Sequence, residues 1–169
     1  MRPGGAGGCH PFPVRTAIQN ERGARRMANP SKARGTRSET LAVRWLLEHG
    51  FPDADRQPLR GRGDQGDLLV SRRPLVIAEV KSRRSTISPL QVQRWWQQTA
   101  DEAALAKADL GLLIVHRSGV PVANWDAVMP VSDWAMLACE GTPGLPQDDI
   151  LLTGTLADWA LVAKRWVDS

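Results

Sequence analysis

Residues 66–82 read GDLLVSRRPLVIAEVKS. Two apolar runs flank Arg72-Arg73-Pro74, a pattern typical of two strands joined by a tight turn. Asp67 opens the first run, and Glu79-Val80-Lys81 continues the second, so charged side chains interrupt residues that are otherwise typical of buried strands. We therefore predict a β-hairpin that carries ionisable groups at the end away from its turn.

The geometry of such a hairpin brings three of these groups together. Side chains two apart in a strand share a face, so Glu79 and Lys81 point the same way. A turn centred on Arg73 places Asp67 opposite or diagonal to Glu79. Two adjacent carboxylates repel each other unless a cation offsets them, and Mg²⁺ binds one or two carboxylates while it keeps several waters. The pattern indicates a divalent-metal site, with an ordinary ion pair at a strand end as the alternative.

The whole chain is typical of one globular domain. Its length is 169 residues, of which 42% are hydrophobic and 24% charged, and this is an ordinary globular balance. No apolar run approaches the ~18 residues of a membrane span, and no secretion signal is seen at the N-terminus. Cys9 and Cys139 match no metal-ligand spacing, which favours reduced thiols in a cytoplasmic protein.

The remaining pattern predicts an α/β domain with a mixed sheet. The predicted order is a helix, three strands, a helix, two strands and a helix, with a short helix before the last. The first helix covers about Thr36–His49, where Thr36 or Ser38 caps it and Gly50 ends it. The second helix begins at Ser88-Pro89 and ends at about Lys107. The other predicted elements are strands near 55–59, 67–71, 75–82, 110–115 and about 125–129, a short helix around 132–139, and a helix at 156–167.

The charge is distributed unevenly. Residues 1–86 carry 17 Lys and Arg against 8 Asp and Glu, whereas residues 87–169 carry 5 against 10. A basic half that contains the hairpin suggests a polyanion such as DNA as the partner. Arg60, Arg62, Arg83 and Arg84 flank the predicted site and are candidates for phosphate contacts, with a solvated basic rim as the alternative.

Gly66-Asp67 and Glu79-Val80-Lys81, with eleven residues between the two acids, resemble the motif of the PD-(D/E)xK nuclease superfamily, which has the restriction-endonuclease-like fold. Within it the chain resembles Holliday junction resolvases of the archaeal and phage type. Further similar segments are GTRSE at 35–39, EVKSRR at 79–84, WWQQTADEA at 95–103, LLIVHRSG at 112–119 and WDAVMPVSDWAML at 125–137. The resemblance covers about residues 35–138. It departs from the superfamily name at Gly66, which stands in place of Pro.

The resemblance implies a central mixed sheet flanked by helices and a DNA endonuclease that depends on Mg²⁺ or Mn²⁺. Asp67 and Glu79 would hold the metal, Lys81 would position the attacking water, and Glu39 would support the metal site from the first helix. Gln98 would face the site from the second helix. Resolution of a four-way junction needs two symmetric cuts, so the resemblance also implies a homodimer.

Each further candidate has a structural alternative. Glu39 could instead be a carboxylate that the N-terminal end of a helix favours, and Gln98 a solvated helix residue. Asp64 is a loop residue with a possible metal role, and Gln93 and Gln97 are rivals of Gln98. We expect Trp95, Trp96, Trp125 and Trp134 in the core rather than in base stacking, and His116 in a structural role.

We predict three sections of the chain. Residues 1–34 form a disordered basic tail, with a translation start possible at Met27, residues 35–139 form the nuclease domain, and residues 140–169 form a loop and a C-terminal helix that packs on it. Another nuclease of the same fold, such as a nicking or restriction-type enzyme, is one alternative. A catalytically silent DNA-binding module is the other, and a metal-dependent cleavage assay separates it from the nucleases.

Overall fold

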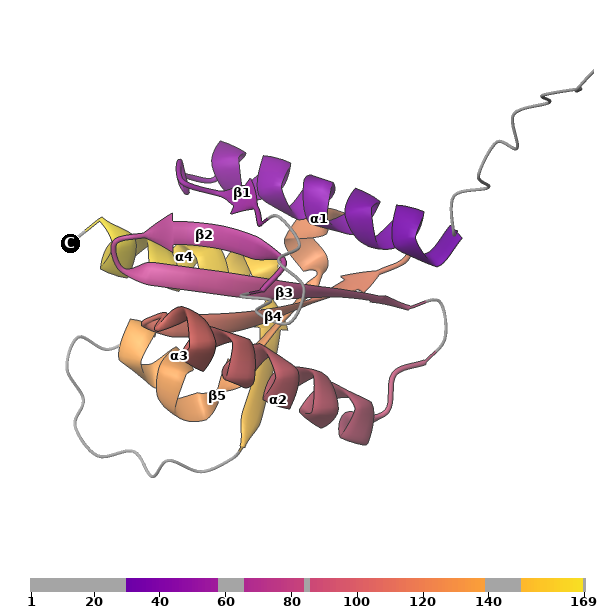
Figure 1. The fold of residues 1–169 in the computed structure, drawn as a ribbon. Coiled ribbons are helices and arrows are strands. Elements are labelled where there is room, and N and C mark those ends of the chain that lie inside the picture. The colour runs from indigo at the N-terminus through magenta and orange to yellow at the C-terminus, as the bar shows by residue number, and fades with distance from the viewer. Residues whose placement is uncertain (1–29, 58–65, 84–85, 139–149, 169) are drawn as a thin grey trace, which may run out of the picture.

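A computed structural model describes residues 30–57, 66–83, 86–138 and 150–168, without the side chains of 30–34 and 83. The elements are α1 (Pro30–Glu48), β1 (Asp55–Arg56), β2 (Leu68–Arg72), β3 (Leu75–Arg83), α2 (Pro89–Ala106), β4 (Leu110–Arg117), the short 3₁₀ turn η2 (Val122–Asn124), β5 (Asp126–Pro130), α3 (Val131–Ala138), β6 (Leu151–Thr155) and α4 (Leu156–Val167). Strands and helices form a layered α/β structure (Figure 1), so the predicted fold class is confirmed.

One six-stranded sheet organises the molecule, with its strands in the order in which they occur in the chain. β3 and β4 are parallel, and every other neighbouring pair is antiparallel. A parallel pair needs a crossover connection, and α2 supplies it between β3 and β4. The sheet is therefore mixed, as predicted.

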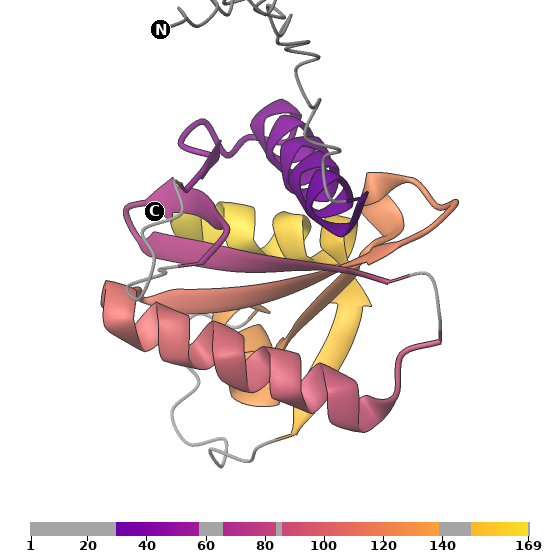
Figure 2. The same cartoon turned by 45° about the vertical axis from the view of Figure 1, so that its right-hand side comes forward.

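Helices cover both faces of this sheet. Figure 2 shows α1 and α4 on one side and α2 on the other. The larger core lies between the sheet and α1 and α4, where Leu46, Phe51 and Trp159 are fully buried. A smaller cluster under α2 contains Leu113 and Val115 of β4. Alternate residues of the central strands therefore face two different layers.

The sequence signals for the ends of the helices are mostly confirmed. Ser88 caps α2, because its side chain accepts a hydrogen bond from the backbone N–H of Gln91, and Pro89 is the first helical residue. Gly50 follows the end of α1 with a φ of +90°, a conformation that glycine adopts without steric cost. The predicted helix at 156–167 coincides with α4.

Two elements differ from the prediction. α1 begins at Pro30 rather than near Thr36, so Thr36 and Ser38 lie within the helix and do not cap it. The apolar period on which the prediction relied begins only where the helix meets the core. The sequence analysis predicts no strand at Leu151–Thr155, where the structure has β6. In β6 Gly154 is required, since a Cβ there would lie 2.8 Å from the Trp134 ring.

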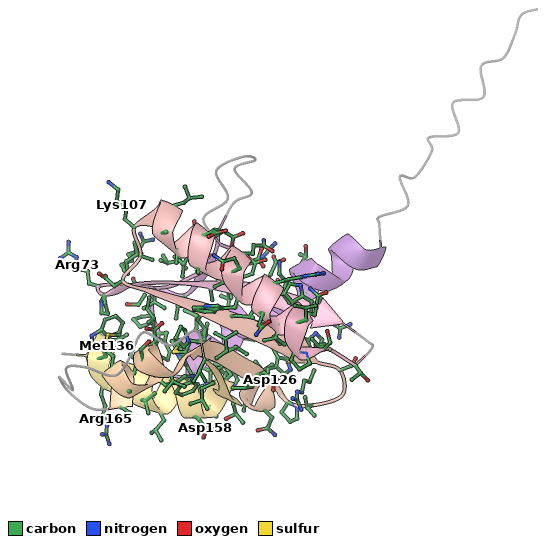
Figure 3. The ribbon with its side chains drawn as sticks, turned by 90° about the horizontal axis from the view of Figure 1, so that it is seen from below. Arg73, Lys107, Asp126, Met136, Asp158 and Arg165 are labelled. Atoms are coloured by element: carbon green, nitrogen blue, oxygen red, sulfur yellow. The ribbon has the colours of Figure 1, made fainter. Side chains whose placement is uncertain are left out.

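The two ends of the sheet are distinct. Figure 3 shows Arg73, in the turn between β2 and β3, and Lys107, after α2, at the same end of the molecule. Near this end, the side chain of Asp109 accepts a hydrogen bond of 2.7 Å from the backbone of Leu75. Glu79 and Lys81 lie further along β3, toward the other end. Within the described residues, no helix is long and apolar enough to cross a membrane.

Candidate active site

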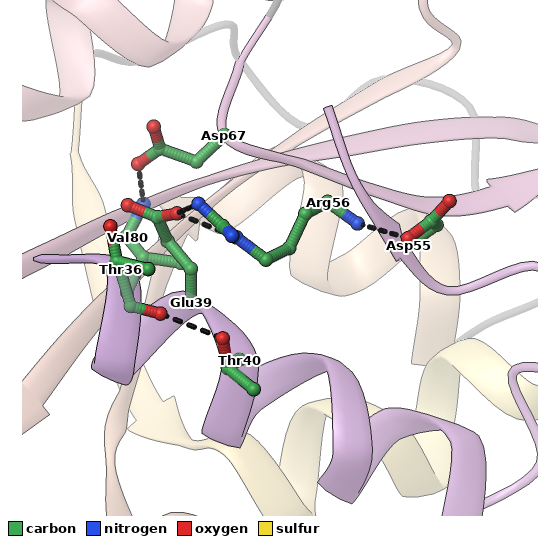
Figure 4. A network of polar contacts seen from close by, with 7 residues as sticks. All are labelled: Thr36, Glu39, Thr40, Asp55, Arg56, Asp67 and Val80. Atoms are coloured by element: carbon green, nitrogen blue, oxygen red, sulfur yellow. Dashed lines mark hydrogen bonds and ion pairs between the residues drawn. The ribbon is translucent and has the colours of Figure 1, made fainter. Parts of the chain in front are cut away.

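β3 extends beyond the hairpin, and one of its backbone amides is bound by a carboxylate. β2 pairs with β3 only as far as Leu68 opposite Ala78, whereas β3 continues to Arg83. Asp67 stands immediately before β2. Its Oδ2 accepts a hydrogen bond of 2.9 Å from the backbone N–H of Val80 (Figure 4). The carboxylate therefore continues the pairing where β2 ends and lies beside the charged part of β3.

The predicted hairpin register is confirmed in this region. Leu68 lies opposite Ala78, which is the pairing of a hairpin that brings Asp67 beside Glu79. The sequence does not predict the register shift that follows Leu69. Arg72 lies opposite Leu75, so the turn is centred between Arg73 and Pro74 rather than on Arg73 as predicted. The shift between Leu69 and Ser71 then sets the predicted pairing of Leu68 with Ala78.

The backbone conformation at position 66, immediately before Asp67, favours glycine. Its φ is +88°, which a proline cannot adopt because the ring holds φ near −65°. A Cβ at this position would lie 3.1 Å from Cδ1 of Ile77 and 3.3 Å from the carbonyl oxygen of Ala78. The departure from the proline of the superfamily name therefore follows from the path of the chain into Asp67.

Glu79 and Lys81 share the face of the sheet that α2 covers. Their neighbours in the parallel strand β4 are Leu113 and Val115, which belong to the apolar cluster beneath that helix. The Glu79 side chain is only 6% exposed, and the Lys81 Nζ donates to its Oε1 in an ion pair. A buried acid thus has one basic partner from its own strand.

Burial shifts the protonation of both hairpin acids. It raises the pKa of Asp67 to about 7, and the neighbouring charges of Glu79 and, to a lesser extent, Glu39 act in the same direction. The hydrogen bond from Val80 opposes this rise. Burial also raises the pKa of Glu79, although the ion pair with Lys81 partly counteracts it. The site therefore disfavours the ionised form of both carboxylates unless a cation offsets their charge.

α2 adds an amide and a further acid to the site. The Gln98 Nε2 donates to the Glu102 Oε1 over 2.8 Å and lies 3.5 Å from the Glu79 Oε1. Glu102 is buried, and its charge adds to the rise in the pKa of Glu79. The sequence analysis missed Glu102. Its position one helical turn after Gln98 is the signal that could have found it.

The two rivals of Gln98 lie elsewhere. Gln97 is exposed and donates to Asp101 over 3.0 Å on the outer surface of α2. Gln93 is exposed and lines a separate cavity of about 910 Å³ between α2, β4 and β6. Of the three glutamines, Gln98 is the one that contacts Glu79 and Glu102.

Glu39 approaches the site from α1 but is already paired. Its Oε2 accepts hydrogen bonds from the Arg56 Nε over 2.9 Å and from the Nη2 over 2.5 Å (Figure 4). The sequence analysis missed Arg56, which lies in the two-residue strand β1 and carries no motif signal. Glu39 therefore lies close enough to influence Asp67, while Arg56 offsets part of its charge.

Several predicted residues lie outside the described part of the chain. These are Arg60, Arg62, Asp64 and Arg84, together with the side chain of Arg83. Their proposed phosphate or metal contacts remain predictions. The predicted loop at 140–149 and residues 1–29 of the predicted tail also lie outside the described residues. The prediction of a disordered tail is wrong for residues 30–34, which belong to α1.

The tryptophans of this region and His116 pack as predicted. Trp125 is 1% exposed, and Trp95, Trp96 and Trp134 pack against the buried clusters. The His116 Nδ1 lies 2.8 Å from the Ser38 Oγ and 3.0 Å from the Ser82 Oγ, and its ring packs on Trp125. Burial lowers the pKa of His116, and Arg37 adds to this effect. His116 thus joins α1 to β3 and β4.

The donor set suits a hard divalent cation that is held by few protein ligands. Across the described ranges, no group of three or more His, Cys, Asp and Glu could hold a metal ion. Asp67 and Glu79 nevertheless offer neighbouring carboxylates whose charge the protein incompletely offsets. Mg²⁺ typically binds through one or two carboxylates and keeps several waters. These two residues fit that pattern, and Glu39 and Glu102 lie around them.

No family model matches the chain, and no curated protein matches it. Among solved structures, the chain is similar to Hjc, a Holliday junction resolvase from the archaeal hyperthermophile Archaeoglobus fulgidus. The two chains share 20% identity with a TM-score of 0.45, and the similarity covers 75% of this chain and 95% of that chain. Because this similarity is low, we infer the function of the chain from its own residues.

Proposed function

We propose that the chain is a DNA endonuclease that depends on a divalent metal and cleaves branched DNA. The observation that supports this most is the position of Asp67, which the Val80 amide holds beside the buried Glu79–Lys81 pair. An ordinary ion pair at a strand end does not need a second, half-buried acid beside it. Two acids and an ammonium group in one place suit phosphodiester hydrolysis.

Each residue has a distinct role in this proposal. Asp67 and Glu79 hold Mg²⁺ or Mn²⁺, which supplies Lewis-acid chemistry that acidifies water and stabilises charge on a phosphate. Lys81 orients the attacking water and stabilises the negative charge that develops on the phosphate. Gln98 orients the Glu79 carboxylate, and Glu39 supports the site while Arg56 fixes its side chain.

The proposal that the substrate is branched DNA rests on the charge of the sequence and on the resemblance, not on the geometry of the site. The basic character of residues 1–86 favours a nucleic acid, and Arg60, Arg62, Arg83 and Arg84 adjoin the hairpin in sequence. We propose that these arginines contact phosphates. The preference for a four-way junction follows the resemblance of residues 35–138 to junction resolvases. Two symmetric cuts require two sites, so a homodimer is part of this proposal.

Cleavage of a synthetic four-way junction, beside a linear duplex of matched sequence, tests this function. The full chain should cut the junction with Mg²⁺ or Mn²⁺ and stop in excess chelator. Ca²⁺ should support binding better than turnover, because its longer and looser coordination positions water poorly. Asp67→Asn should abolish cleavage and retain binding, since it removes a metal ligand and a negative charge.

The other outcomes identify the alternatives. Cleavage that persists in excess chelator would remove the metal from the proposal. Equal cleavage of junction and duplex would indicate a nuclease of different specificity. Binding without cleavage in any cation would indicate the DNA-binding module. Asp101→Asn, which neutralises an exposed acid of α2, is the matched control for Asp67→Asn.

A further inference from the structure

Glu102 is a buried acid that the proposed chemistry does not use. It is 9% exposed and lies on the inner face of α2, beside Thr99 and Ala103. Its Oε1 accepts the hydrogen bond from Gln98. Its Oε2 is fully buried and has no hydrogen-bond partner within the described part of the chain.

Such a group is costly unless something offsets it. Burial of a carboxylate disfavours the charged form, and an oxygen without a donor adds the cost of lost hydration. The basic side chain of this site, Lys81, forms its ion pair with Glu79. A neutral glutamine could accept the same hydrogen bond from Gln98 at lower cost. The purely structural role therefore does not explain why an acid stands at position 102.

We propose that Glu102 is a further carboxylate of the cation site, which strengthens cation binding on the Glu79 side. This inference rests on the proposed function. Glu102 and Glu79 both accept from the Nε2 of Gln98, and the charge of Glu102 acts on Glu79, so their carboxylates lie close together. A hydrated divalent cation offers what the unpartnered oxygen lacks, namely positive charge and hydrogen-bond donors.

The role of Glu102 is to position and attract the cation rather than to complete a set of direct ligands. No trio of His, Cys, Asp and Glu among the described residues could hold a single ion, so Asp67, Glu79 and Glu102 do not form one set. Groups that act through the direct ligands commonly change metal affinity by ~10–100-fold when they are replaced. Glu102 acts in this way.

Calorimetric titration of the full chain with Mg²⁺ alone, without DNA, tests the inference. Glu102→Gln keeps the side-chain volume and the acceptor for Gln98 but removes the charge. It should weaken Mg²⁺ binding by about 10-fold or more. Asp101→Asn removes an exposed charge from the adjacent position of the same helix, and it should leave the affinity nearly unchanged because solvent screens that charge.

A second measurement separates the role of the charge from a loss of folding. In chelator, Glu102→Gln should melt at a temperature equal to or above that of the wild type, because a buried charge is gone. Mg²⁺ should then raise its melting temperature less than that of the wild type. If Glu102→Gln does not fold, Glu102→Met offers an apolar side chain of similar length, and the same loss of Mg²⁺ affinity is expected.

The outcomes distinguish this inference from the function on which it rests. Wild-type affinity for Mg²⁺ in a folded Glu102→Gln or Glu102→Met variant would overturn the role of Glu102 and leave the proposed function intact. Absence of Mg²⁺ binding to the wild-type chain would overturn the proposed metal site, and the role of Glu102 with it.

Discussion

Asp67 has an environment unlike that of an ordinary surface acid. Burial and the charge of Glu79 raise its pKa from 3.8 to about 7. At a pH between these two values, Asp67 holds a proton in the folded chain and has released it in the unfolded chain. The free energy of unfolding should therefore fall as pH rises through this window, and the stability present at low pH is lost above about pH 7. Glu79 acts in the same direction.

Urea denaturation of the chain in chelator, at several pH values between 5 and 8, checks this prediction. The wild type should lose stability with rising pH more steeply than Asp67→Asn, which has no proton to lose at this position. Asp101→Asn should follow the wild type. Equal slopes for the wild type and Asp67→Asn would show that Asp67 titrates as a surface acid.

The sequence predicts the hairpin acids well because they depend on local rules. The alternation of side chains in a strand and a turn near Arg73 place Asp67 within one residue of Glu79, and the register shift between Leu69 and Ser71, which the sequence does not predict, completes the pairing. Local rules do not predict the burial of Glu102, since this burial depends on how α2 packs across the sheet. They do not predict the pairing of Arg56 either, because its partner Glu39 belongs to a distant helix.

At the scale of elements, the contact between α1 and β1 places an ion pair, Glu39 with Arg56, beside the site. Arg56 of β1 holds Glu39 of α1 through two nitrogens. Without this arginine, the charge of Glu39 would act on Asp67 with less compensation. Arg56→Ala should therefore lower the melting temperature in chelator, and added Mg²⁺ should restore part of the loss.

Differential scanning fluorimetry with and without Mg²⁺ measures this effect. The control is Arg44→Ala, which removes an exposed arginine from α1, the helix that carries Glu39. This variant should change the melting temperature little. An Arg56→Ala variant with the melting temperature of the wild type in chelator would mean that the Arg56–Glu39 pair is a solvated surface pair of little energetic weight.

The elements themselves differ in how far the sequence predicts them. α4 has both an apolar stripe and a capping box formed by Thr155 and Asp158, and its predicted range is confirmed. The first turns of α1 lack an apolar stripe, so the periodicity gives no signal there. β6 is hidden because Gly154 is typical of a turn, although the packing of Trp134 against the strand requires it.

For the whole molecule, the central claim is that chemistry and binding are carried by different groups. Glu79 and Lys81 lie on β3 with Asp67 beside them, whereas the candidate arginines are the last residue of β3 and residues of the segments that adjoin the hairpin in sequence. Removal of Lys81 should therefore affect the cleavage step far more than the affinity for DNA.

Single-turnover cleavage of a four-way junction by Lys81→Ala in Mg²⁺, beside a measurement of junction affinity, tests this claim most directly. The rate should fall by ~10²-fold or more, which is the scale for a preorganised group that stabilises charge. Affinity should change by about one phosphate contact. Lys164→Ala, on α4 at the opposite face of the sheet, should cut at the wild-type rate. A folded Lys81→Ala variant that cuts as fast as the wild type would contradict the account and reduce Glu79 and Lys81 to a structural ion pair.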